Sequence, residues 1–513
     1  MRSCFLMIAF IMLAACWPPA SAADFDPAVD GWYFSNWGEA SEFTWDLYRK
    51  TYLGINPTHD CIEAPLDCAF YEIFKNCAQQ GNCGGMSLLA LALYKYGGYM
   101  GFCSPACFYT GVEGPDRTDL HQAINILQAR QFSASGIEHF LDTVDAGDLN
   151  DAVAAFNKIR SCLATGDYAV LSIATDAIGG SAHTVIPYKV QDGPGGGYPK
   201  KIYIWDSNFE HNRFASHYDG VANVMTINSA TNWTYTGATT YSGSGAGGAW
   251  CFAIPMSVVL PKSRQPIALD MVFDALMTAF VTGTGCAVSQ ITDEQGRRFY
   301  KTDADVHSSG ADLETDPSKR LKGVGRWQWY AQRGAKEPPG ELYFIRRPGG
   351  RPASLSFTFS GKAYRATIGG GRDVIQIDSK SAGAAKDIVT VSGLATAAPS
   401  VRVTTLAPER EFTIKQIRQD SKSKDWRSIE VKSLKAARDV SVTIEAVGNL
   451  ESVAVFSGDK PVSFDVDAQE RINGQHVSRK LQRVSTTPGK LMMLRPRDRT
   501  TLEKMELQRP KLQ

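Results

Sequence analysis

Cys83 is the residue in this chain best placed for nucleophilic chemistry. It lies in the run Gln-Gly-Asn-Cys-Gly-Gly-Met-Ser, which leads directly into an apolar stretch that ends at Gly97. A stretch that is apolar on nearly every side predicts a buried helix, and the glycine predicts its C-terminal end. The unpaired N–H groups and the dipole at the start of a helix favour a thiolate, the reactive form of cysteine. The alternative is a buried structural cysteine or half of a disulfide.

A histidine and an acid follow on two predicted strands. The segment after His183 and the segment before Asp206 are rich in β-branched and aromatic residues, and a Gly/Pro-rich turn joins them. If Val190 pairs with Lys201, antiparallel register places His183 opposite Asn208 and diagonal to Asp206 on one face. An imidazole that takes the thiol proton and a carboxylate that orients it are the partners a cysteine nucleophile needs. The alternative is that His183 is a core residue with a purely structural role.

With the order Cys, His, Asp, the chain resembles the papain-like cysteine peptidases. The closer resemblance is to a bacterial extracytoplasmic subgroup, which carries a Gly-Asn-Cys-x-Gly-Met-Ser box, a His-x-Val-x-x-Tyr strand and a Tyr-x-x-Asp-x-Asn strand. These three patterns match residues 81–87, 183–188 and 203–208. The resemblance covers about residues 60 to 260. It implies a papain-like fold with the nucleophile on a central helix and the other two residues on an antiparallel sheet.

The resemblance also implies roles for individual residues. Cys83 would be the nucleophile, His183 the general base and then the acid, and Asp206 the group that orients His183. Papain-like enzymes stabilise the oxyanion with the backbone N–H of the cysteine and an upstream side-chain amide. The candidates for the oxyanion site or for support of the triad are the amides of Gln80, Asn82 and Asn208.

The N-terminus predicts export. A short apolar run, too short to span a bilayer, is followed by Ala-Ser-Ala, so we expect a signal peptide cleaved after Ala22 and a periplasmic or extracellular protein. The box Leu-Ala-Ala-Cys that ends at Cys16 leaves a lipid anchor at Cys16 as an alternative. No other segment is long and apolar enough to predict a transmembrane helix.

Export permits disulfides, and the cysteine count then bears on the site. Of the 11 cysteines, two lie in the predicted signal peptide, which leaves an odd number and so at least one free thiol. Cys83 is the natural candidate. Cys61–Cys68 and Cys103–Cys107 are close enough in sequence to form local pairs. The chain has no Cys-x-x-Cys pair and no His-x-x-x-His spacing, so we expect no metal site and no cofactor.

The pattern of the chain changes near residues 260–266, and its length predicts more than one domain. An amphipathic pattern over 266–284 predicts a helix, and short alternating segments typical of antiparallel sandwiches follow it. The fold class is therefore α+β: a papain-like catalytic domain and then C-terminal all-β, sandwich-like modules. The predicted division is 1–22 signal peptide, 23–262 papain-like domain, 263–398 β-rich domain with a leading helix, and 399–513 second β-rich module with a basic tail. Strands are predicted at 354–359, 374–377, 388–391, 401–405, 411–417, 427–431, 440–446 and 452–456.

Three function classes are compatible with this sequence. The first is a secreted thiol hydrolase, most simply a peptidase acting on a protein or peptide. The second uses the same triad for acyl transfer or glutamine deamidation, as transglutaminase-like enzymes do. The third is a non-catalytic envelope-binding protein on a papain-like scaffold, attached to a cell-envelope surface by its β-modules. This third class is favoured if residues 80–86 are aligned with the more familiar papain pattern Gln-Gly-x-Cys-Gly-x-Cys-Trp. In that alignment Met86, which cannot act as a nucleophile, occupies the position of the catalytic cysteine. The net charge of +1 gives no reason to expect nucleic acid as a partner.

Overall fold

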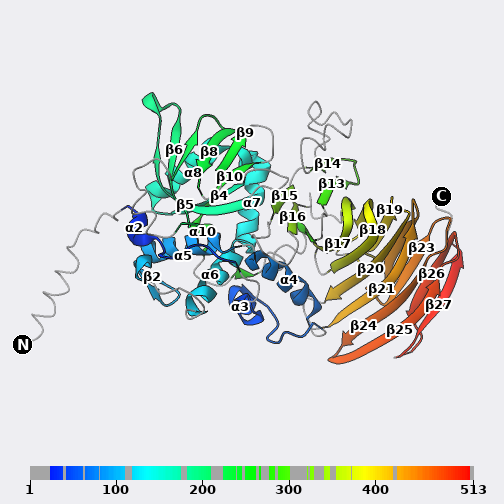
Figure 1. Ribbon diagram of the computed structural model, residues 1–513. Coiled ribbons are helices and arrows are strands. Elements are labelled where there is room, and N and C mark those ends of the chain that lie inside the picture. Colours follow the sequence, from blue (N-terminus) through cyan, green and yellow to red (C-terminus); the bar gives the residue numbers. More distant parts are fainter. Residues whose placement is uncertain are drawn as a thin grey trace, which may run out of the picture.

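The structure is a computed structural model, and it divides into a mixed helix-and-strand N-terminal part and a C-terminal part built of strands (Figure 1). It describes residues 24–508 apart from internal segments at 39–41, 62–63, 80, 110–117, 175–181, 210–222, 238–239, 245–248, 261–264, 267–275, 283–286, 301–320, 322–323, 329–339, 347–353, 371–372, 395, 420–424 and 499. The predicted signal peptide and Cys16 lie outside the described residues.

Helix α5, Cys83–Tyr96, is the central helix of the N-terminal part, as the sequence predicts. Every residue from 84 to 93 is buried, and the helix ends at Gly97, whose φ of 69° is the left-handed conformation of a helix C-terminus. Two glycines in its first turn allow α6, Thr118–Arg130, to approach closely. A Cβ on Gly85 would lie 2.1 Å from the carbonyl oxygen of Ile124. The Gly-Gly pair after the cysteine therefore serves helix packing.

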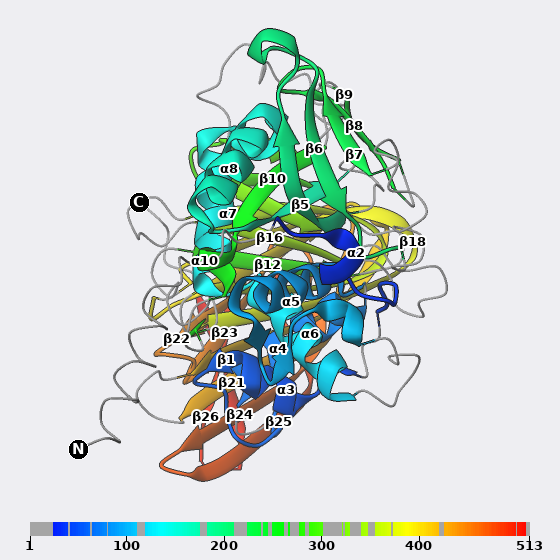
Figure 2. The same cartoon turned by 90° about the vertical axis from the view of Figure 1, so that its left-hand side faces the viewer.

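Helices α6 and α2, Pro27–Asp30, pack directly against α5, whereas α8, Ala152–Thr165, packs against strands of the sheet in a separate apolar core. The segment before residue 61 packs against α5, because Trp32 and Trp45 are buried in the same apolar core as that helix. Both views place the antiparallel sheet above α5 and α6 and α3 below them, and Figure 1 shows α4 beside them on the side of the C-terminal strands (Figures 1 and 2). The helices are α2 Pro27–Asp30, α3 Trp45–Thr51, α4 Pro65–Gln79, α7 Ala134–Ala146, α8 Ala152–Thr165 and α10 Met256–Val259, with 3-10 turns η2 Ala106–Phe108, η4 Asp148–Asn150 and η5 Pro194–Gly196.

The N-terminal sheet has seven antiparallel strands in the order β10-β4-β5-β6-β7-β8-β9. They are β4 Ala169–Ala174, β5 Ala182–Gln191, β6 Lys200–Trp205, β7 Val224–Ile227, β8 Asn232–Thr236, β9 Thr240–Ser244 and β10 Trp250–Pro255. Two further two-stranded sheets are separate from it: β1 Tyr52–Leu53 pairs in parallel with β11 Gln265–Pro266, and β2 Gly98–Tyr99 pairs antiparallel with β3 Phe102–Cys103.

The predicted β5–β6 hairpin is present, but its register at the turn differs by one residue from the prediction. Val190 pairs with Ile202 and not with Lys201. A bulge between Pro187 and Lys189 then shifts the pairing by one, so that Ile186 lies opposite Trp205. The bulge restores the predicted register at the end of the hairpin that carries His183.

The C-terminal strands form one antiparallel sheet of 16 strands that curves into a near-barrel. The long strand β18 organises it, because it pairs with β19 through residues 387–392 and with β20 through residues 373–380. The strands are β12 Leu276–Thr282, β13 Ala287–Asp293, β14 Arg298–Tyr300, β15 Val324–Gln328, β16 Gly340–Arg346, β17 Leu355–Gly370, β18 Asp373–Ser392, β19 Ser400–Thr405, β20 Glu409–Gln419, β21 Trp426–Ala437, β22 Ser441–Val447, β23 Ser452–Ser457, β24 Ser463–Ile472, β25 Gln475–Ser485, β26 Lys490–Pro496 and β27 Leu502–Gln508. All eight strand segments predicted between 354 and 456 lie within or overlap these strands.

The helix predicted over 266–284 is wrong where the structure describes it. Leu276–Thr282 is β12, which pairs with β16 on one side and β17 on the other. Its two faces belong to different cores: Phe280 faces the core of the N-terminal part, and Ala279 and Val281 face the core of the C-terminal sheet. A strand buried on both faces has a continuous apolar sequence without alternation, which periodicity does not separate from a helix.

The two parts of the chain share an apolar core. Phe344, Val374 and Ile417 from the C-terminal strands pack with the helices of the N-terminal part. At the edge of this contact Arg346 forms an ion pair with Asp142 of α7, at 2.7 Å. The sheet therefore buries one side of the helical layer.

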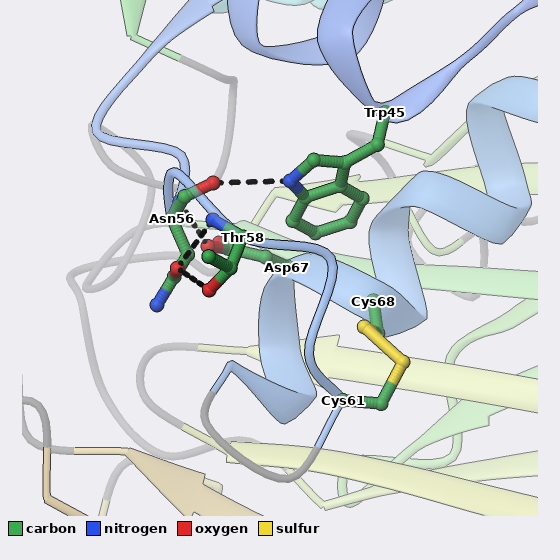
Figure 3. The surroundings of a disulfide bond; sticks show 6 residues. All are labelled: Trp45, Asn56, Thr58, Cys61, Asp67 and Cys68. Atoms are coloured by element: carbon green, nitrogen blue, oxygen red, sulfur yellow. Dashed lines mark hydrogen bonds between the residues drawn. A yellow bond between two sulfur atoms is a disulfide. The ribbon is translucent and has the colours of Figure 1, made fainter.

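One predicted disulfide is present and one is not. Cys61 and Cys68 form a disulfide beside the buried indole of Trp45 (Figure 3). Cys103 and Cys107 are both free thiols. Closeness in sequence alone does not orient two cysteine side chains toward each other. Cys162 and Cys251 are also free and buried, so Cys83 is one of several unpaired thiols. Within the described part of the chain, none of the helices is both long enough and apolar enough to cross a bilayer.

Candidate active site

The Cys83 side chain is half-buried at the first residue of α5. Asn82 precedes the helix without capping it through its side chain. The N–H of Gly84 is hydrogen-bonded to the Cys83 sulfur, and the N–H of Gly85 donates instead to Oε1 of Gln128 at 2.8 Å. Ser87, one turn farther on, donates from Oγ to the carbonyl oxygen of Thr184 on β5 at 3.2 Å. This bond connects the helix that begins at Cys83 to the strand that carries His183.

His183 lies near the start of β5 and is 3% exposed. Its Nε2 lies 2.6 Å from Oδ1 of Asp206, and its side chain is also hydrogen-bonded to Cys83. Because Nε2 faces the carboxylate, Nδ1 is the ring nitrogen left for the thiol. The structure thus brings together Cys83, His183 and Asp206, the three residues predicted from the sequence.

Asp206 follows the last residue of β6 and is fully buried. Its carboxylate accepts from three groups: the imidazole of His183, the backbone N–H of Asn208 at 2.8 Å and the hydroxyl of Tyr235 on β8 at 2.7 Å. Tyr235 stacks on Tyr241 of β9, which in turn stacks on the ring of His183. A buried carboxylate with three donors is held rigidly in its ionised form.

The electrostatics of the three groups favour an ion pair between the thiol and the imidazole. Burial raises the pKa of Cys83, but the facing His183 and the hydrogen bonds to sulfur outweigh it and hold the pKa below its usual value. Burial opposes the charged imidazole, yet Asp206 and Cys83 together raise the pKa of His183 well above its usual value. Burial likewise opposes the carboxylate of Asp206, and its donors, His183 foremost, keep its pKa lowered. Burial and the neighbouring Asp206 raise the pKa of Tyr235.

The three amides predicted to support the site have different positions. Gln80 lies outside the described residues. Asn82 is fully buried, and its Nδ2 donates at 3.2 Å to the carbonyl oxygen of Trp37, in the segment between α2 and α3. Asn208 lies next to the imidazole, with Nδ2 3.2 Å from Nε2 of His183. Of these, Asn208 is the one in contact with a triad residue.

Sequence reasoning missed Asn36 and Tyr235. Asn36 contacts both Asn82 and Asn208, from which it is 46 and 172 residues away in the chain. Tyr235 lies on a strand whose buried residues alternate with exposed ones, and the pattern marks it only as a core position. No local pattern distinguishes either residue, since both act through contacts made by the folded chain.

No protein-family model, no curated protein and no solved structure matches this chain.

One group of side chains has the spacing of metal ligands. The ligand atoms of His59, Cys61 and Cys68 lie within 4.8 Å of one another. Both sulfurs are engaged in the disulfide, so neither can act as a thiolate ligand while that bond is intact. The group lies beside Trp45, whose ring stacks on His59.

Proposed function

We propose that this chain is an exported, papain-like cysteine hydrolase that cleaves peptide bonds or closely related amides through Cys83. The observation that carries the proposal is the buried contact of 2.6 Å between His183 Nε2 and Asp206 Oδ1, with the same imidazole hydrogen-bonded to the thiol at the start of α5. Acyl transfer needs a nucleophile, a general base and an acid that orients the base, linked by hydrogen bonds in that order.

The chemistry follows from the ion pair. The Cys83 thiolate attacks the carbonyl carbon, and a C–S bond forms as the C=O π electrons move to oxygen. The imidazolium of His183 then gives its proton to the leaving amine as the C–N bond breaks, which leaves a thioester. Water, deprotonated by His183, cleaves the thioester and restores the thiol. Asp206 stays ionised and keeps Nε2 of His183 fixed throughout.

The negative oxygen formed in the attack needs hydrogen-bond donors. In the first turn of α5 the N–H of Gly85 donates to Oε1 of Gln128 at 2.8 Å, and the N–H of Gly84 is hydrogen-bonded to the Cys83 sulfur. The backbone N–H of Cys83 itself is therefore the donor we assign to the oxyanion. The disulfide supports the export that the N-terminal sequence predicts, since disulfides persist in oxidising compartments. Attachment of the C-terminal sheet to a cell-envelope surface remains a prediction.

The test is alkylation of the folded, non-reduced protein lacking residues 1–22, with iodoacetamide, from about pH 4 to about pH 9, followed by peptide mapping. We expect fast labelling of Cys83 at acidic and neutral pH, and a large loss of that rate in His183→Ala. Cys103 is the matched internal control, because it is a free and exposed thiol with no histidine partner in the described structure. Equal labelling of Cys83 and Cys103 at every pH, unchanged by His183→Ala, would refute the proposal. Peptide libraries and amine acceptors then separate hydrolysis from acyl transfer.

A further inference from the structure

We infer that Asn36 is a positioning residue of this active site, which locks the Asn208 amide in one orientation and joins the loop that carries Asp206 to the start of the nucleophile helix. The inference rests on the proposed function, since it concerns how the Cys83–His183 pair is held. It assigns a role in the reaction to a residue of the N-terminal segment, which precedes α5 and carries none of the three reacting groups.

Asn36 uses three polar groups to join two distant segments. Its backbone N–H donates to the carbonyl oxygen of Ser207 at 2.7 Å. Its Oδ1 accepts from the backbone N–H of Asn82 at 2.8 Å, and its Nδ2 donates to Oδ1 of Asn208 at 3.2 Å. Asn82 is the residue directly before Cys83, and Ser207 and Asn208 directly follow Asp206. One side chain thus connects both halves of the site.

The hydrogen-bond chain has a fixed direction. A backbone N–H can only donate, so the Asn36 atom that faces Asn82 must be the amide oxygen. The Asn36 atom that faces Asn208 is then the NH₂ group, which can only donate, so the facing atom of Asn208 must be its oxygen. The NH₂ group of Asn208 is consequently the atom that lies 3.2 Å from Nε2 of His183.

This direction decides which group accepts from His183. With its NH₂ turned toward Nε2, Asn208 cannot accept the imidazole proton, and Asp206 at 2.6 Å is the acceptor. The Nε2–H bond therefore points at Asp206 with no competing acceptor, and Nδ1 stays directed at Cys83. Without Asn36, the Asn208 amide can turn over and offer its oxygen to Nε2, which draws the ring away from its line with Asp206.

The inference is tested with Asn36→Ala, which keeps the backbone bond to Ser207, and with Asn56→Ala as the matched control. Asn56 is also an asparagine of the N-terminal segment whose side chain makes two hydrogen bonds, both to Thr58, but it lies by the disulfide and contacts no triad residue (Figure 3). We expect Asn36→Ala to slow Cys83 alkylation about tenfold near neutral pH, the scale of one to two lost hydrogen bonds, and to move its pH midpoint upward. Asn56→Ala should leave both values unchanged.

Two further variants test the direction of the chain. In Asn36→Asp the carboxylate still accepts from Asn82 but cannot donate to Asn208, so we expect a loss at least as large as in Asn36→Ala. The double variant Asn36→Ala/Asn208→Ala should be no slower than the slower single variant, because the two residues act in series. Additive losses, or an Asn36→Asp protein as reactive as the parent, would overturn the inference.

The outcomes separate this inference from the proposed function. If His183→Ala leaves Cys83 alkylation unchanged, the proposed function fails. If His183→Ala slows it but Asn36→Ala behaves as Asn56→Ala does, the triad stands and the role of Asn36 is wrong. Circular dichroism and the thermal midpoint of each variant identify a loss of reactivity that comes from unfolding.

Discussion

The hydroxyl of Tyr235 is the contact that most directly tests how the site holds its buried acid. Tyr235→Phe removes the donor that lies 2.7 Å from Oδ2 of Asp206 and leaves the ring in place. Hydrogen bonds to charged groups contribute about 1.5–3 kcal/mol, and a buried partner left unsatisfied costs a similar amount. Because Asp206 keeps two other donors, we expect the lower part of this range, about 1.5–2 kcal/mol, in the free energy of unfolding at neutral pH.

The loss should depend on pH in a direction fixed by the lowered pKa of Asp206. A carboxyl group whose pKa is lower in the folded than in the unfolded chain stabilises the fold above its unfolded pKa, and that contribution disappears as the pH falls through the folded value. The effect of Tyr235→Phe should therefore be full at pH 7 and shrink below about pH 4. Loss of this donor raises the pKa of Asp206, which weakens its hold on His183, so Cys83 alkylation should also slow.

The assay is urea unfolding followed by tryptophan fluorescence, with Cys83 alkylation as the second readout. Tyr241→Phe is the matched control, since Tyr241 stacks on Tyr235 in the same cluster and its hydroxyl has no hydrogen bond to Asp206 in the described structure. An equal destabilisation by both variants would show that the loss comes from the aromatic cluster and not from the carboxylate. If Tyr235→Phe left both the free energy of unfolding and the Cys83 alkylation rate unchanged, the reasoning would be refuted.

Three other predictions concern the scaffold. Gly85→Ala should destabilise the protein by more than about 2 kcal/mol and slow Cys83 alkylation, because the added Cβ meets a backbone carbonyl of α6. Gly97 has open space around it and a φ of 69°, so Gly97→Ala should cost only about 1–2 kcal/mol and leave Cys83 alkylation unchanged. Arg410→Ala should lower the free energy of unfolding in urea by about 3–5 kcal/mol, because it leaves the fully buried carboxylate of Asp387 without its ion-pair partner. The exposed ion pair of Arg365 with Asp378 should contribute less than about 1 kcal/mol. Cys61→Ala should lower stability by about 2.5 kcal/mol through loss of the disulfide, with Cys83 alkylation as in the parent; an altered alkylation rate would contradict the separation of the two sites.

The parts of the site that follow from local sequence were predictable. The nucleophile helix is specified by an apolar run with a glycine end, and the hairpin by two strand-forming segments and a turn. The pairing of His183 with Asp206 followed from the assumed register, although the turn end of the hairpin is shifted by one. The bulge at Tyr188 compensates for that shift, and nothing in the local pattern specifies a bulge there.

The parts that depend on long-range contacts were not predictable. Asn36 reaches Asn208 across 172 residues of sequence, and a polar residue in an irregular segment carries no sign of its partners. The strand β12 resembled a helix because both of its faces are buried, in different cores. Cys103 and Cys107 looked like a pair because sequence distance says nothing about side-chain direction.

The apolar contacts between the helical layer and the C-terminal strands bear on when the protein becomes competent. Val374 and Ile417 complete the packing around the helices, yet they follow Cys83 by most of the length of the chain. If the chain is exported N-terminus first, as we propose, the thiol emerges long before these residues do. The helical layer would then gain these packing partners last, and the proposed hydrolase would become active only after Ile417 has left the export machinery. Such a delay would protect neighbouring unfolded chains from the proposed activity during export.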